Sequence, residues 1–269
     1  MTTEVAAAVV RPGRLPSRLP RALAAVLVAT AIAYPLSSGA TRDGVSWAIV
    51  VLGAALSVVH AWVARGARTG AGALLLVTTT AVAFEAFGLA TGFPDGRYSY
   101  DDALGPTLIG VPFLVPLAWL MMAWPSWVLA DRLAGSRRWR VATAAGIFAG
   151  WDVVLDPQMV QAGYWTWAHP SPGLPGIGTV PLTNLVGWLL AGGALMVVLD
   201  VLVARTSVPG APLVGDAAPL LALGWMTLGG ALAHAGWLGL PGSAAWGAAL
   251  AVPVLTALLV RRRRSQGHG

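Results

Sequence analysis

Apolar stretches of about 20 residues recur eight times between Ala22 and Val260, and this repetition restricts the chain to a membrane. Each stretch is long enough to cross the roughly 30 Å hydrocarbon core of a bilayer as a helix. Hydrophobic residues make up 57% of the chain and charged residues only 10%, too few to cover a water-soluble fold. We therefore predict an all-α fold, a polytopic transmembrane helical bundle. A soluble enzyme, a secreted disulfide scaffold and a disordered tail are excluded.

The predicted spans form a single transmembrane domain over residues 22–260, between an N-terminal arm (1–21) and a basic C-terminal tail (261–269). The first span reads as a signal anchor, with a cleaved signal peptide as the alternative, because it ends in small residues, Ser37-Ser38-Gly39-Ala40. The fourth is long because its prolines kink it or because part of it lies flat. The eight spans cover residues 22–38, 45–64, 71–90, 106–130, 141–158, 180–204, 217–239 and 244–260.

The arginines predict the orientation of the bundle. All 17 basic residues are arginine, and with eight spans 15 of them fall on one side, leaving only Arg42 and Arg97 on the other. The positive-inside rule makes the arginine-rich side cytoplasmic, with both termini inside. The net charge of +6 then reflects topology and contact with anionic membrane lipids, and we expect no nucleic-acid partner. The predicted location is a bacterial plasma (inner) membrane, which the chain crosses several times.

Missing residue types narrow the chemistry. The chain has no cysteine, which excludes disulfides, thiolate nucleophiles and iron–sulfur ligation. It has no lysine, which excludes a Schiff base. Its four histidines are too scattered for the clustered boxes of a membrane di-iron oxygenase. We therefore expect neither a metal nor a cofactor, and a chemistry of carboxylates, water and aromatic rings.

Three carboxylates are predicted to gather in the outer half of the bundle. Glu85 lies in the third span, and Asp152 and Asp156 share one face of the fifth at i,i+4 spacing. Asn184 and His234 are expected at the same depth. An ionisable group at membrane depth is a functional candidate by default, although a buried carboxylate can instead hydrogen-bond a neighbouring helix. By contrast, Asp131 and Asp200 end spans near arginines on the cytoplasmic side, and we expect both to be interfacial.

Two outer loops, residues 91–106 and 161–181, combine turn residues with alternating aromatics. Aromatics at this depth commonly form a lipid-facing belt. The alternative is a cap over a lipid-like substrate, in which ring faces would stabilise a developing cation. The aromatic residues of these loops are Tyr98, Tyr100, Tyr164, Trp165 and Trp167, with Phe93 preceding them.

An ordered set of short motifs runs through residues 84–190. The motifs are Glu85, Gly88, Thr91-Gly92, Pro94, Gly96, Tyr98, Tyr100, Leu104-Gly105-Pro106, Gly110-Val111-Pro112, Val115-Pro116, Ala118-Trp119, Asp152, Asp156-Pro157, Met159, Gly163, Trp165, Trp167, Val180-Pro181, Asn184 and Gly187-Trp188. In this order they resemble the motifs of the CruF-type carotenoid hydratases, an integral-membrane family of carotenoid biosynthesis. The sequence departs from the expected pattern at Asp95 and at Gly178-Thr179, and these departures bear on the substrate more than on the reaction class.

The resemblance implies a hydro-lyase that adds water to the terminal C=C of an acyclic carotenoid, lycopene-like or C50, without a cofactor. Such a reaction needs a strong proton donor, a tertiary carbocation and a positioned water. A carboxylic acid buried at low dielectric can stay protonated at neutral pH, and a second carboxylate can deprotonate water. The predicted catalytic residues are Asp152 and Asp156 as the acid/base pair, either of which can be the acid, with Glu85 as a third. The predicted substrate-binding residues are Tyr98, Tyr100, Trp151, Tyr164, Trp165, Trp167, Asn184 and His234.

Two other functions fit parts of the pattern. Intramembrane carboxylates also serve a transporter or proton-coupled carrier. The D-x-x-x-D spacing of Asp152 and Asp156 prompts a prenyltransferase, although that chemistry requires a second Asp-rich motif for magnesium and diphosphate. The expected partners of a hydratase are its carotenoid, water, membrane lipids and other enzymes of the carotenoid pathway. Which carotenoid is used, whether both its ends react and whether the protein oligomerises stay open.

Overall fold

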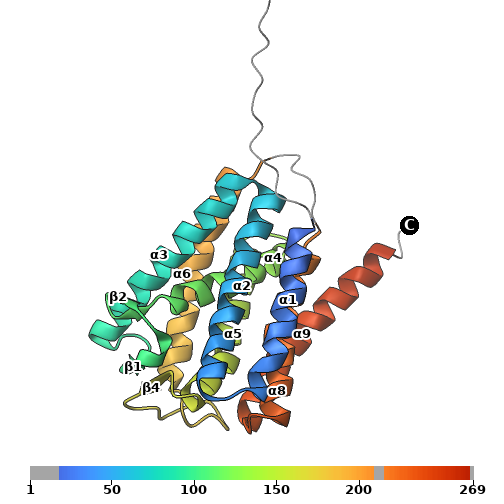
Figure 1. The fold of residues 1–269 in the computed structure, drawn as a ribbon. Helices are drawn as coiled ribbons and strands as arrows, with labels where there is room; N and C mark the ends of the chain where they lie inside the picture. The colour runs from blue at the N-terminus through green and yellow to red at the C-terminus, as the bar shows by residue number, and fades with distance from the viewer. Residues whose placement is uncertain (1–17, 209–214, 267–269) are drawn as a thin grey trace, which may run out of the picture.

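The computed structural model describes residues 18–208 and 215–266, and its helices pack into one bundle (Figure 1). A helical segment corresponds to each predicted apolar stretch, so the all-α polytopic bundle is confirmed. The seventh segment is one continuous run of α7, the π-helical turn η3 and α8. The segments are α1 (Leu19–Ala33) with η1 (Tyr34–Leu36), α2 (Gly39–Arg65), α3 (Ala67–Thr91), α4 (Leu114–Leu133), α5 (Arg137–Gln161), α6 (Leu182–Thr206), α7 (Ala217–Gly224) with η3 (Trp225–Gly229) and α8 (Gly230–Gly236), and α9 (Pro241–Gln266).

Within the described residues, six of these segments are long and apolar enough to cross a membrane, and the protein is a multi-pass membrane protein. The segments α5 and α9 are not among the six. The carboxylates Asp152 and Asp156 lower the hydropathy of α5, and several side chains in the second half of α9 lie outside the described part. The count of eight spans and the cytoplasmic location of both termini stay predictions. Of the predicted N-terminal arm, residues 1–17 lie outside the described residues, while α1 already begins at Leu19.

The predicted start of the fourth span was wrong. Helix α4 begins at Leu114, and the preceding residues form a short hairpin of β2 (Thr107–Leu108) and β3 (Val111–Pro112). Its tight turn contains Ile109 at φ 55° and Gly110 at φ 79°, backbone conformations that a right-handed helix does not contain. Pro112 also lacks the N–H that a helix interior would use.

Helix α4 lies at the centre of the bundle, where it packs against α2, α3, α5, α6 and α7. From Trp119 to Ala130 every residue is buried. The helix is apolar around its whole circumference, and such a helix is stable only when neighbours cover all its faces. Its length of 20 residues gives the other helices a common axis, and its first turns supply one wall of the site.

Two short strands cover one end of the bundle. Strand β1 (Tyr98–Tyr100) follows α3, strand β4 (Trp165–Trp167) follows α5, and the two pair antiparallel. They join the two aromatic loops that the sequence places on the same side. Figure 1 shows them at the end opposite the turn between α2 and α3.

The opposite end holds the arginines and their carboxylate partners. Asp200, which is 1% exposed, accepts from Arg137 Nε at 2.8 Å and Arg140 Nε at 2.6 Å. Asp131 is within 3.3 Å of Arg65 and 3.2 Å of Arg140. The arginines that face these two carboxylates thus come from neighbouring helices, and Asp200 is more deeply buried than an interfacial position implies. These four ion pairs hold helix ends together.

Candidate functional site

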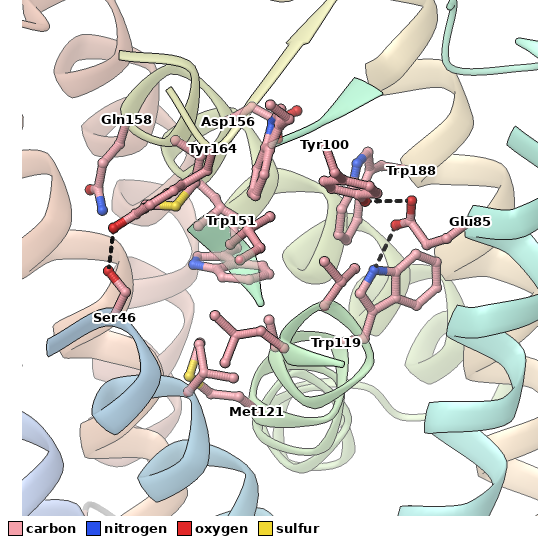
Figure 2. A pocket seen from close by; sticks show the side chains of 18 of the residues that line it. Ser46, Glu85, Tyr100, Trp119, Met121, Trp151, Asp156, Gln158, Tyr164 and Trp188 are labelled. Atoms are coloured by element: carbon pink, nitrogen blue, oxygen red, sulfur yellow. Dashed lines mark hydrogen bonds between the residues drawn. The ribbon is translucent and has the colours of Figure 1, made fainter. Parts of the chain in front are cut away.

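A cavity enclosing about 990 Å³, part of it continuous with the surroundings, lies beneath the two-stranded sheet. Its walls come from α2, α3, α4, α5 and α6, with the sheet on top, so segments far apart in sequence meet around it. Most of the lining is apolar or aromatic, and the polar groups are few. In Figure 2, Glu85 and Trp119 lie on one side, Ser46, Gln158 and Tyr164 on the other, and Asp156 above Trp151.

Glu85 is held by three neutral donors. The hydroxyls of Tyr98 and Tyr100 donate to its Oε2 at 2.6 and 2.8 Å, and Trp119 Nε1 donates to its Oε1 at 3.2 Å. Burial and the negative charge of Glu85 raise the pKa of both tyrosines, so they keep their protons and serve as donors. The carboxylate is 7% exposed and belongs to the cavity wall. The three donors fix both of its oxygens in place.

The second carboxylate group is a pair that shares one amide. Asn184 Nδ2 donates to Asp152 Oδ2 at 2.8 Å and also to Asp156 Oδ2. Trp165 Nε1 donates to Asp156 Oδ1 at 3.2 Å. Asp156 faces the main cavity, whereas Asp152 lies behind Asn184 and lines a small separate pocket. The predicted i,i+4 pair therefore has one member at the cavity and one behind it.

The sheet presents four aromatic rings to the cavity. Tyr98 lies opposite Trp167 and Tyr100 opposite Trp165, and the alternation of a strand puts all four on one face. Their centroids are 5.5 to 5.9 Å apart in the order Trp167, Tyr98, Tyr100, Trp165. Trp167 Nε1 also donates to the carbonyl of Asp95 at 3.0 Å. Four of the predicted substrate-binding residues thus form one continuous aromatic roof.

Two indoles of the cavity wall were missed by the sequence analysis as site residues. Trp119 of α4 and Trp188 of α6 have ring centroids 5.0 Å apart, and both face the cavity with Trp151. Trp119 and Trp188 belong to the motifs that carry the family resemblance. A further signal was available, because tryptophans inside an apolar span, away from its ends, are not in the interfacial belt.

Asp95 is a further buried carboxylate that the sequence analysis noted only as a departure. It lies in the turn between α3 and β1, is 5% exposed and lines the cavity. Burial and the nearby charge of Glu85 raise its pKa to about 7. Space around it exists because Gly187 has no side chain, since a Cβ there would overlap Asp95 Oδ1. Among the described residues Asp95 Oδ1 has no hydrogen-bond partner.

Two more predicted residues lie on the far side, and only one of them lines the cavity. Tyr164 lines it and donates its hydroxyl to Asp43 Oδ1 at 2.6 Å, and burial raises its pKa to about 12. His234 is fully buried and lines neither of the two cavities nearest to it. Its Nε2 is 2.9 Å from Gln158 Oε1, so it reaches the cavity only through Gln158. No three His, Asp or Glu side chains group as metal ligands within the described residues.

Comparison with known proteins bears on what such a site does. No solved structure matches the chain. A stretch of 133 residues is 32% identical to bisanhydrobacterioruberin hydratase of Haloarcula japonica, covering 48% of this chain and 44% of that protein's length. The family model described as carotenoid biosynthesis protein matches residues 45–259, which include every wall of the cavity except the α1 side. The chain therefore belongs to the carotenoid biosynthesis protein family.

Proposed function

We propose that this protein is a hydro-lyase that adds water across the terminal C=C of an acyclic carotenoid end group. Family membership and the similarity to a carotenoid hydratase support the substrate class. The observation that carries the proposal is that two separate carboxylate groups, around Glu85 and Asp156, face one aromatic cavity inside a membrane bundle. A substrate dissolved in the bilayer meets both a proton donor and a proton acceptor there.

Asp156 is the proposed proton donor. It shares Asn184 with Asp152, and no Arg or His among the described residues forms an ion pair with either carboxylate. Two adjacent carboxylates in a dry site cannot both ionise, so the pair retains a proton. Asp156 delivers this proton to the less substituted carbon of the double bond. Asp152, behind Asn184, is a positioning residue in this scheme.

The aromatic walls fit the intermediate. Protonation leaves a tertiary carbocation on the more substituted carbon, and the faces of indole and phenol rings attract a cation. The roof rings and the pair of Trp119 and Trp188 supply such faces on two sides of the cavity. These rings stabilise the cation without forming a bond to it, so water can capture it.

Glu85 is the proposed base. The three hydrogen bonds that it accepts favour its ionised form and hold it in one orientation. Water attacks the cationic carbon through its oxygen and gives up one proton to Glu85. The alkene gains one hydrogen and one hydroxyl, and transfer of the proton from Glu85 back to the Asp156 pair restores the site. The reaction consumes one water and uses no cofactor.

The setting of this activity is also a proposal. The segregation of the arginines favours an orientation that puts the site in the outer half of the membrane, and we propose that this is a bacterial plasma membrane. Other carotenoid-pathway enzymes, which make the acyclic substrate and consume the tertiary alcohol, are the expected partners.

The test is expression in a bacterial host that accumulates lycopene or a C50 acyclic carotenoid, grown in heavy-oxygen water. We expect a pigment heavier by one labelled water, formed equally well without molecular oxygen. Unchanged pigments with the protein verified in the membrane would overturn the proposal. The carboxylates would then be tested by solute flux into proteoliposomes and by assay for prenyl transfer.

A further inference from the structure

A second cavity of about 860 Å³ adjoins the first, between the end of α1 and the seventh segment. Its walls come from α1 and η1 on one side and from η3 and α8 on the other, with α5 behind. Apart from Gln158 and a tyrosine hydroxyl its lining is apolar. The residues that face it without facing the first cavity include Ala31, Ile32, Leu36, Val154, Gly229, Gly230, Leu232, Ala233 and Trp237.

Side chains that face both cavities form a wall between them. Residues of α2, α5, η1 and η3 make up this shared wall. They are Tyr34, Ile49, Trp151, Leu155, Gln158 and Met226. Most of them are unbranched or aromatic side chains that change position by rotation about single bonds, so no helix has to move for the cavities to join. His234 holds the amide of Gln158 at this boundary, at 2.9 Å.

The second cavity opens sideways. Large apolar side chains at its rim are exposed on the outer surface of the bundle, with Leu36 at 69%, Leu232 at 62% and Trp237 at 59%. Helix α1 packs against α2 and α7. The opening lies farther along α1, where it faces η3 and α8. Beside the opening, the wide turn of η3 is followed by Gly229 and Gly230, whose missing side chains let Trp225 and Val154 pack close to the backbone. In a bilayer this rim faces lipid.

The length of the substrate favours use of the second cavity. An acyclic carotenoid is a rod about as long as the hydrocarbon core is thick, roughly 30 Å. The first cavity lies beneath the sheet at one end of the bundle, so a rod of that length with its end group there extends beyond it. Strands β1 and β4 cover the first cavity on one side, and α4 closes it on the side toward the centre of the bundle. The rest of the polyene therefore leaves through the wall of movable side chains.

We propose that the second cavity, between α1–η1 and η3–α8, binds the conjugated chain of the substrate and conducts it sideways from the site into the bilayer. This inference rests on the proposed function and adds a binding site for a long polyene. The end group of the carotenoid lies beneath the aromatic roof, its conjugated polyene passes Gln158 and Met226, and its other end remains in lipid. Substrate can then enter and product can leave without opening the roof.

The test fills the second cavity from each wall. Ala31→Trp and Ala233→Trp place an indole in it, while Ala29→Trp and Ala235→Trp, on the same helices, point outward and serve as matched controls. Two quantities are measured: pigment retained per purified protein, from visible absorbance, and the hydration rate for a long acyclic carotenoid and for a short isoprenoid with the same end group. The first does not depend on turnover.

We expect Ala31→Trp and Ala233→Trp to lower retained pigment and hydration of the long carotenoid at least tenfold. Both controls should match the wild type, and the rate ratio of short to long substrate should rise. Pigment retention and a rate ratio equal to wild type in both cavity variants would overturn the inference while leaving the hydratase intact. A wild type that neither retains nor hydrates acyclic carotenoids would overturn both. Leu replaces Trp at either position where Trp prevents insertion.

Discussion

The carboxylates at the two ends of the bundle have opposite kinds of partner. At the end with the α2–α3 turn, Asp200 and Asp216 accept from arginines at 2.6 to 2.8 Å, and Asp131 from arginines at 3.2 to 3.3 Å. At the sheet end, Glu85, Asp152 and Asp156 are held by tyrosine, tryptophan and asparagine donors. No ion pair involves these three within residues 18–208 and 215–266.

This difference separates structural from reactive carboxylates. An arginine partner keeps a carboxylate ionised, so it stabilises the fold but has no proton to give. A neutral donor holds the same group in place and leaves its protonation free to change during a reaction. The pKa of Asp216 illustrates the first case, since hydrogen bonds from His60 and Arg132 hold it below its ordinary value despite partial burial.

The largest expected effect comes from removing the proton-transfer groups at the sheet end. Asp156→Asn and Glu85→Gln preserve shape and most hydrogen bonds but cannot exchange protons, and each should lower hydration about 10³-fold or more. Pigment conversion in membranes that contain equal amounts of protein measures this. Asp131→Asn, which changes the same group at the arginine end, is the control and should stay within about twofold of wild type. Full activity of both sheet-end variants would refute the assignment of donor and base.

Substitution of Asp200 should lower stability and leave activity unchanged, the reverse of the effect at the sheet end. Replacing Asp200 by Asn removes the buried charge and leaves one neutral acceptor oxygen for Arg137 and Arg140, and a broken buried pair is strongly destabilising. Because both arginines are partly exposed and can rehydrate, we expect a loss of about 2 kcal/mol in unfolding free energy. Thermal unfolding of the purified protein measures it, while the activity per folded molecule stays at the wild-type level. Lost activity at unchanged stability would show that the arginine end takes part in the reaction.

The fold was largely accessible from the sequence, because hydropathy follows from the solvent that each residue faces. The helical bundle and the family were predicted and are confirmed, and helical segments match all eight stretches. The predicted start of the fourth span was wrong. The apolar run that contains Pro112 has the hydropathy of a span, although the turn at residues 109–110 excludes a helix there. Hydropathy indicates whether a side chain can lie in the membrane, but it does not indicate whether the backbone there is helical.

The site was accessible only in part. Sequence placed Glu85 and Asp156 at one depth, but depth does not say which way a side chain points, and so Asp152 and His234 were grouped with residues that line the cavity. The pairing of Tyr98 with Trp167 depends on contacts 69 residues apart in the chain, which local patterns do not encode. Trp119 and Trp188 were missed because they lie among apolar residues, where only their position inside a span and away from its ends marks them.

The donors to Glu85 provide a finer test of the sheet end. Tyr98→Phe and Tyr100→Phe each remove one hydrogen bond to Oε2 and keep the ring of the aromatic roof. A hydrogen bond to a charged group contributes about 1.5–3 kcal/mol, so we expect a roughly tenfold loss of turnover from each variant. Tyr164→Phe, whose hydroxyl binds Asp43 instead, is the matched control. Equal effects from all three substitutions would mean that the hydroxyls act through folding and not through Glu85.

Asp95 gives the smallest and most specific effect, a pH dependence of stability. Its folded pKa is about 7, against an ordinary value of 3.8, because it is buried near Glu85. Between these pH values the folded protein holds a proton that the unfolded chain has released, so stability falls as pH rises toward 7 and levels off above it. Asp95→Asn stays neutral and should remove that part of the fall, a few degrees in melting temperature between pH 5 and 8. Asp102 is an exposed residue of the same loop, and Asp102→Asn should keep the wild-type fall in melting temperature. If Asp95→Asn also keeps the full fall, the titration belongs to another group.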